Sequence, residues 1–259
     1  MNRQHLLFLI VLSVCIFSGT SYGQTGGLTN GKNVSKLDLY YFSQEFDTDI
    51  TSSAQMAPAI WNRDYEGPYE RDVLMLRGSY GLFDRFDVLV GIGLLDDKHV
   101  ADNRAGTAND HVQKGSDNFL WQVGLRTTFF KTKSGFYLGG LATYSRWDSG
   151  DDSYVAYPTN DPQKRSSEWK EQKLSLYTGT QVGKFSPYAG IEYTDIKVTQ
   201  KLKAYPLSPG ASWVNEYEIE DRWGAVAGIT YPLSKHFDIN AETHFINQTR
   251  FDIGLSYKF

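Results

Sequence analysis

Glu242 and His244 are the two side chains in this sequence best placed to do chemistry together. They lie two residues apart in an alternating segment, so in an extended strand both would point to the same side. A carboxylate beside an imidazole can move a proton, and it can equally form a static ion pair. The polar side of other alternating segments carries charges of both signs. These further candidates are Arg77, Asp87, Arg126, Lys173, Glu192, Glu220, Arg222 and Asp252.

The sequence lacks the motifs of several common kinds of site. It has no Gly-rich phosphate loop between a strand and a helix, no Cys/His cluster and no nucleophile elbow. The acidic residues Asp148, Asp151 and Asp152 match no defined calcium-loop spacing. A formal net charge of −4 offers no basic footprint for nucleic acid. We therefore expect no cofactor, no metal and no nucleic-acid partner.

The amino-terminal residues have the pattern of an export signal. A basic start at Arg3 is followed by an apolar run over residues 6–17 and by small and polar residues up to Gly23. This predicts a signal peptide over residues 1–23, cleaved near Gly23, and a flexible periplasmic lead-in over 24–35. The only cysteine, Cys15, lies in the signal, so the exported part can form no internal disulfide.

Alternation of apolar and polar residues recurs along the remainder of the chain and predicts the elements that carry the candidate residues. An extended strand places alternate side chains on opposite faces, so each such segment has an apolar side and a polar side. The predicted strands cover residues 36–46, 71–83, 86–95, 117–130, 135–147, 168–183, 187–202, 216–231, 237–246 and 250–259.

Composition indicates which environment these strands suit. The chain has 24 Gly, 17 Tyr, 15 Phe and 6 Trp, yet its mean hydropathy is −0.42 and no long apolar run follows the signal. These features exclude a helical membrane protein, which needs apolar runs of about 20 residues. In a transmembrane barrel strand only every second residue faces lipid, so the average hydropathy of the strand stays low and a hydropathy plot does not detect it.

The predicted connections are short at one end of the strands and long at the other end. Short turns follow the second, fourth, sixth and eighth strands, whereas long polar loops over residues 47–70, 96–116, 148–167 and 203–215 follow the first, third, fifth and seventh. Aromatic residues such as Phe83, Phe86, Phe129 and Tyr231 flank the short turns. Short periplasmic turns, long outward loops and aromatic girdles are typical of outer-membrane barrels.

The last ten residues supply the most specific pattern. Every second residue back from the carboxyl end is large and apolar: Phe259, Tyr257, Leu255, Ile253 and Phe251. In this the chain resembles the bacterial outer-membrane β-barrel proteins, small porin-like barrels included, whose final strand ends in Phe and is read as an assembly signal. The resemblance implies residence in the outer membrane of a Gram-negative-type cell, contact with its lipid, and insertion by the barrel-assembly machinery.

We therefore predict an all-β fold, a transmembrane antiparallel up-and-down β-barrel of about ten strands over residues 36–259, with eight or twelve strands as alternatives. The polar faces would line the lumen, either as a plugging ionic network or as a narrow charged pore for small solutes. Function would then be porin-like or structural. A surface-binding barrel that acts on a ligand through its outward loops is the competing interpretation.

An enzyme is the least favoured interpretation. The omptin family of ten-stranded outer-membrane proteases has an Asp pair opposite a His–Asp pair on the rim. Asp96 and Asp97 lie at the outer end of a predicted strand, with His99 and His111 in the loop that follows. No Asp-x-His pairing stands at the outer end of a distant strand, so an outer-membrane hydrolase is not expected.

Overall fold

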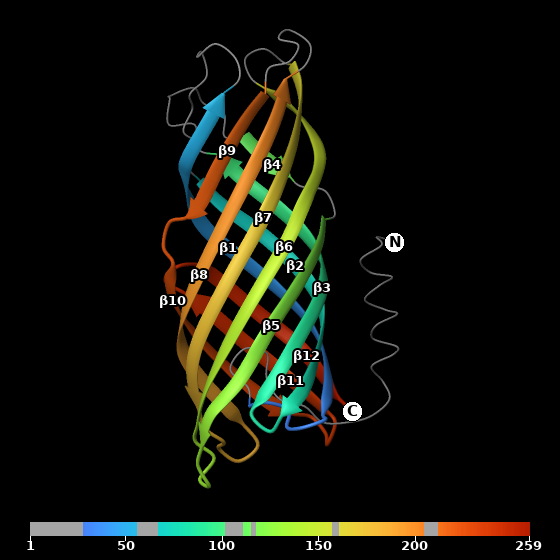
Figure 1. Ribbon diagram of the computed structural model, residues 1–259, viewed down its shortest axis with the longest axis vertical. Helices are drawn as coiled ribbons and strands as arrows, with labels where there is room; N and C mark the ends of the chain where they lie inside the picture. Colours follow the sequence, from blue (N-terminus) through green and yellow to red (C-terminus); the bar gives the residue numbers. More distant parts are fainter. Residues whose placement is uncertain (1–27, 56–66, 102–110, 115–117, 157–160, 205–211) are drawn as a thin grey trace.

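The computed structural model describes residues 28–55, 67–101, 111–114, 118–156, 161–204 and 212–259. Tilted strands form a tall barrel, with the short turns at the lower end of Figure 1 and the chain's carboxyl end among them. The predicted signal over residues 1–23 lies outside the described residues, as do residues 24–27 of the predicted lead-in. The described residues include no helix of the length and apolar character that would cross a membrane.

The barrel wall is built from strands that pair in antiparallel order around a closed circuit. They are β1 (Ser35–Gln55), β2 (Gly67–Phe83), β3 (Phe86–Ala101), β5 (Asn118–Lys131), β6 (Tyr137–Ala156), β7 (Asp161–Gly179), β8 (Ser186–Ala204), β9 (Ser212–Ile219), β10 (Trp223–Pro232), β11 (Phe237–Phe245) and β12 (Thr249–Lys258). Strands β9 and β10 both pair with β8, β9 with its upper part and β10 with its lower part. The two strands therefore share one position in the wall. The wall therefore has ten positions, and β12 closes it against β1. This confirms the predicted antiparallel barrel of ten strands.

A further short strand, β4 (His111–Lys114), pairs with the outer end of β3 and lies off the circuit.

Side chains alternate between the lumen and the outer surface, as the sequence pattern predicts. In β11, Asp238, Asn240 and Glu242 are buried inside, whereas Ile239 is 39% exposed on the outside. The outward row forms an apolar belt around the barrel, with exposed members such as Val90 on β3. An apolar belt with satisfied backbone groups on every strand is the arrangement that a bilayer requires.

Several strands run far beyond this belt. β1, β6, β7 and β8 have 21, 20, 19 and 19 residues, whereas a membrane crossing needs about 9–11. The described parts of the loops predicted over 47–70, 96–116, 148–167 and 203–215 are therefore strand. Above the membrane both faces of a strand can be polar, so the sequence shows no alternation there.

The position shared by β9 and β10 differs from the prediction of one continuous strand over residues 216–231. The chain bends at residues 220–222, between the two strands, and the inward phase reverses there. Tyr217 points into the lumen and Glu220 is exposed. Arg222 pairs outside the barrel with Asp195, at 3.0 Å. Glu220 and Arg222 therefore do not line the lumen, because a bend that breaks the alternation separates them from the strand that follows.

The hairpin of β11 and β12 ends below the rim, and above it β1 pairs directly with β9. Its turn is tight. Asn247 is buried beneath it, and a Cβ on Gly224 would lie 2.0 Å from the Asn247 Oδ1 atom. A larger residue at position 224 would therefore require the Asn247 side chain to shift. Ile246, in the same turn, adopts a φ of 86°, a left-handed conformation that strains a β-branched residue. Its side chain is 73% exposed.

We expect Ile246→Asn to stabilise the barrel by about 1 kcal/mol, because asparagine tolerates positive φ and the exposed isoleucine packs against little. Equilibrium urea unfolding of the refolded barrel in lipid vesicles would measure the change. Thr249→Asn, an exposed site in the same hairpin without positive φ, is the control and should give no such gain. An unchanged or lowered free energy of unfolding for Ile246→Asn would contradict the strain at this turn.

Candidate functional site in the barrel lumen

An ion pair closes the lower end of the lumen. Arg126 on β5 and Asp87 on β3 are directly opposed in register, with Arg126 Nη2 at 2.6 Å from Asp87 Oδ2 and both side chains fully buried. Asn30 enters this pair from the chain segment before β1. Its backbone N–H donates to the Asp87 carboxylate at 3.0 and 3.1 Å, and its side-chain oxygen accepts from Arg126 at 3.1 Å. Part of the predicted flexible lead-in is thus a plug.

A second ionic group lies beside it, where β1, β2 and β12 meet. The Asp38 carboxylate forms ion pairs with Lys36 Nζ at 2.8 Å and with Arg77 Nη2 at 3.3 Å. Ser256 donates its hydroxyl to the same carboxylate at 2.5 Å. Strand pairing dictates this meeting, because Asp38 is opposite Arg77 on one side and Ser256 on the other. All four side chains are buried.

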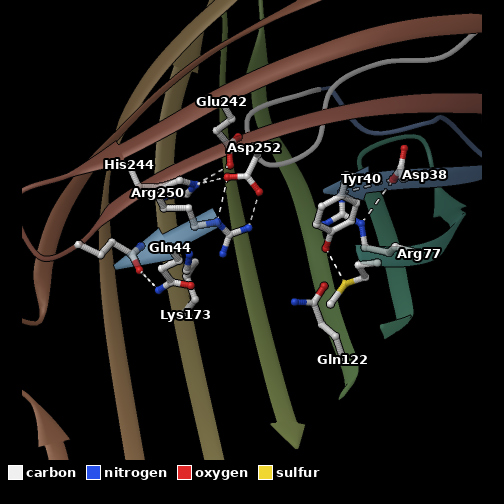
Figure 2. A network of polar contacts seen from close by, with 12 residues as sticks. Asp38, Tyr40, Gln44, Arg77, Gln122, Lys173, Glu242, His244, Arg250 and Asp252 are labelled. Carbon is white, nitrogen blue, oxygen red and sulfur yellow. Dashed lines mark hydrogen bonds and ion pairs between the residues drawn. The ribbon is translucent and has the colours of Figure 1, made fainter. Parts of the chain in front are cut away.

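The middle of the lumen is organised around His244, as Figure 2 shows. Its Nε2 atom lies 2.8 Å from Glu242 Oε1 and 3.3 Å from Asp252 Oδ2, and its Nδ1 atom lies 2.7 Å from Glu192 Oε2. Arg250 holds both oxygens of Asp252, at 2.8 and 2.5 Å. Three strands, β8, β11 and β12, therefore meet in one buried polar network around one imidazole.

A third set of ion pairs lies above this network. Arg71 Nη2 is 2.5 Å from Glu171 Oε2 across the lumen. Lys173 lies 3.9 Å from Glu171 and 3.7 Å from Glu192, so it links this set to the network around His244. Gln44 accepts a hydrogen bond from Arg71 at 2.7 Å.

Aromatic side chains fill the lumen toward the outer end. Trp147 and Trp169 stack with ring centroids 5.3 Å apart, and Tyr69 meets Trp169 edge-on at 4.7 Å. The Arg71 guanidinium lies 4.5 Å from the centre of the Trp147 ring, which joins the aromatic layer to the ionic layer below. Phe46 packs against the same rings. Trp147 and Trp169 are 1% and 2% exposed, so the upper lumen is filled.

The structure places most of the predicted lumen residues together inside the barrel. Arg77, Asp87, Arg126, Lys173, Glu192, Glu242, His244 and Asp252 are all buried there. The predicted assembly residues Phe251, Ile253, Leu255, Tyr257 and Phe259 form the outward row at β12.

Other residues of the lumen did not stand out in the sequence. They are Asn30, Lys36, Asp38, Arg71, Glu171 and Arg250. Lys36 and Asp38 alternate with apolar residues in a predicted strand, so their inward phase was the signal available. Arg71 began a predicted strand at a loop boundary, and Asn30 had no strand pattern to mark it.

The charges of the buried inward side chains nearly balance one another. Among the described residues, seven carboxylates face the lumen: Asp38, Asp87, Glu171, Glu192, Asp238, Glu242 and Asp252. Six lysines and arginines face them: Lys36, Arg71, Arg77, Arg126, Lys173 and Arg250. A positively charged His244 would make the two signs equal. Charges buried in so narrow a space must be paired, and here they pair across strands.

The three groups Glu242, His244 and Asp252 also have the composition of a metal site, with ligand atoms within 4.8 Å of one another. Those atoms are already engaged. Arg250 binds both oxygens of Asp252, and Tyr188 donates to the second oxygen of Glu242. A divalent ion at this site would have to displace these hydrogen bonds and ion pairs.

Comparison with known proteins identifies the fold. No family model matches the chain, and no curated protein matches it in sequence. Among solved structures, it is similar to the outer membrane protein OprG from Pseudomonas aeruginosa, with 14% identity, a TM-score of 0.50, and coverage of 89% of this chain and 98% of that one. It is also similar to the translocator domain of autotransporter NalP from Neisseria meningitidis, with 12% identity, a TM-score of 0.46, and coverage of 99% and 95%.

The chain is therefore a bacterial outer-membrane β-barrel by fold. Its closed antiparallel wall and apolar belt agree with a lipid environment. The particular barrels that it is similar to share little sequence with it, so the likeness extends to the fold alone.

We expect Arg126→Met to destabilise the barrel by roughly 3–5 kcal/mol, because it leaves the buried Asp87 carboxylate without its cation. Arg126→Met combined with Asp87→Leu should recover most of that loss, since no buried charge is then left unpaired. Urea unfolding of the single and double variants in vesicles would give both values. Equal losses in the single and double variants would contradict the assigned pairing.

Proposed function

We propose that this protein is a closed, non-conducting outer-membrane barrel that acts as a structural scaffold of the envelope and presents its raised outer strands at the cell surface. The filled lumen carries this proposal. Between the Asn30 plug and the Trp147–Trp169 stack, the described inward side chains pair with one another or pack together. A barrel of about eight strands has room only for side chains, and ten strands lie near that limit.

The height of the outer wall supports the second half of the proposal. β6 and β7 pair from Tyr137 and Gly179 near the short turns to Ala156 and Asp161 at the far end. The apolar outward row on these strands ends at Tyr144 and Leu174, and the charged residues Arg146 and Lys170 follow above it. A wall raised on a stiff, filled barrel suits contact with a surface ligand, the alternative function considered above.

The same network argues against catalysis in the lumen. A general acid or base must reach a substrate, and His244 is 1% exposed with both ring nitrogens facing carboxylates. At the rim, Asp96 is exposed, but the side chains of Asp97, His99 and His111 lie outside the described part of the chain. We therefore propose a non-enzymatic role.

Planar-bilayer recording of refolded residues 24–259 would test the proposal. We expect no discrete conductance steps in 1 M KCl for a preparation whose heat-modifiable gel shift shows a folded barrel, because ionic and aromatic layers fill the lumen. Reproducible single-channel steps would overturn the scaffold proposal in favour of a narrow charged pore.

A cysteine-access experiment makes the same test residue by residue, since residues 24–259 contain no cysteine. Ser145→Cys and Ser175→Cys lie in the lumen at 3% and 6% exposure, whereas Ser43→Cys lies on the exposed outer wall. A charged methanethiosulfonate reagent should modify the Ser43 variant quickly and the two lumen variants far more slowly. Equal rates would show a water-filled lumen.

We also propose that the outward row of β12 guides insertion by the barrel-assembly machinery. The row is apolar, and β12 is the strand that closes the wall against β1. Tyr257→Ala combined with Phe259→Ala should lower the amount of assembled barrel in cells several-fold, because recognition of the strand would weaken. The same variant should still refold in detergent. Normal assembly in cells, or equal failure in detergent, would contradict a role in recognition.

A further inference from the structure

A pocket opens at the short-turn end of the barrel, beside the Asn30 plug. Its volume is about 480 Å³, within the range of about 300–1,000 Å³ that is typical of small-molecule sites. Four separate parts of the chain line it: the segment 28–30, the turn after β2, the lower end of β5 with the turn that follows, and the last residue of β12. In a barrel of this type the short-turn end faces the periplasm.

Positive charge dominates the lining of this pocket. Arg85, Lys131, Lys133 and Lys258 contribute to it, and Asp84 is the one carboxylate among the described lining residues. Within the described part of the chain, Lys131 and Lys133 form no ion pair, and both are exposed. This contrasts with the lumen immediately above, where every lysine and arginine named above faces a carboxylate.

Hydroxyl groups add neutral hydrogen-bonding capacity between these charges. Thr29, Thr128 and Thr132 line the pocket. The Thr29 and Thr128 hydroxyls lie 3.2 Å apart, and Thr29 also donates to the Asp84 carbonyl at 3.0 Å. These contacts hold the segment before β1 against the turns, so the pocket has one wall made of the plug itself.

We propose that this pocket binds a small periplasmic molecule that carries at least two oxyanion groups, phosphate or carboxylate. A guanidinium and ammonium groups set around a concave site favour such a ligand, because charge-assisted hydrogen bonds to oxyanions are strong and arginine can bind them in a bidentate manner. A ligand that contacts Thr29 and Lys131 would also tie the plug to the wall. The site is separate from the lumen and does not depend on whether the lumen conducts.

Isothermal titration of refolded residues 24–259 in a neutral detergent, at 150 mM NaCl, would test this site with pyrophosphate and with citrate as probes. We expect saturable one-site binding of at least one probe, and the stronger of the two identifies the preferred oxyanion. Lys131→Gln combined with Lys133→Gln should weaken that binding by about tenfold or more, because two charge-assisted hydrogen bonds are lost.

The matched control is Lys170→Gln combined with Lys197→Gln. It removes the same charge from exposed lysines on β7 and β8, above the apolar belt and far from the short turns, so binding should be unchanged beyond the screening distance of about 8 Å. Equal weakening in both double variants would show a nonspecific charge effect and overturn the proposal. Binding that appears only at low salt, or no binding of either probe, would overturn it as well.

Discussion

A narrow closed wall is the constraint on which this structure depends. A strand in lipid must find partners for all of its backbone groups, so the sheet closes from β12 onto β1. Ten wall positions enclose too little space for a wide column of water. The inward side chains therefore have to pair or pack with one another, and the outward side chains of the belt have to be apolar. The ionic groups and the aromatic stack follow from that geometry.

The contents of the lumen change with height, from mixed ionic and apolar groups inside the membrane belt to mainly aromatic rings above it. Inside the membrane belt, charged side chains such as Asp87 and Arg126 pair with cross-strand neighbours that are fixed in register. An apolar cluster that includes Tyr137, Tyr177 and Tyr188 is also buried in this part. Aromatic rings occupy the taller part above, where the wall is polar outside. Arg71 belongs to both layers, because it pairs with Glu171 and stacks on Trp147. A barrel that is filled in this way is stiff, which suits a scaffold that raises its strands beyond the membrane.

Much of the fold and of the lumen was predictable from the sequence inside the apolar belt, and little of it was predictable above the belt. Alternation has a strict period of two where lipid faces one side, and so it located the ten wall positions and the inward phase of residues such as Arg126 and His244. The bend before Trp223 left no such trace, because Glu220 and Arg222 continue the pattern of charged residues on alternate positions. Above the belt, polar residues on both faces concealed the extensions of β1 and β6. Asn30 was hidden because its role rests on tertiary contacts alone.

The network around His244 shows how much of a buried polar site can be predicted from the sequence of one strand. A Glu-x-His pair on one face predicted two groups side by side, and the structure has them 2.8 Å apart. The sequence did not reveal Glu192 and Arg250 as their neighbours, since these come from other strands whose register had to be known first. With seven buried carboxylates against six lysines and arginines, a protonated imidazole would make the two signs equal among these side chains. Its position between these carboxylates therefore fits a role in balancing the charge of the lumen.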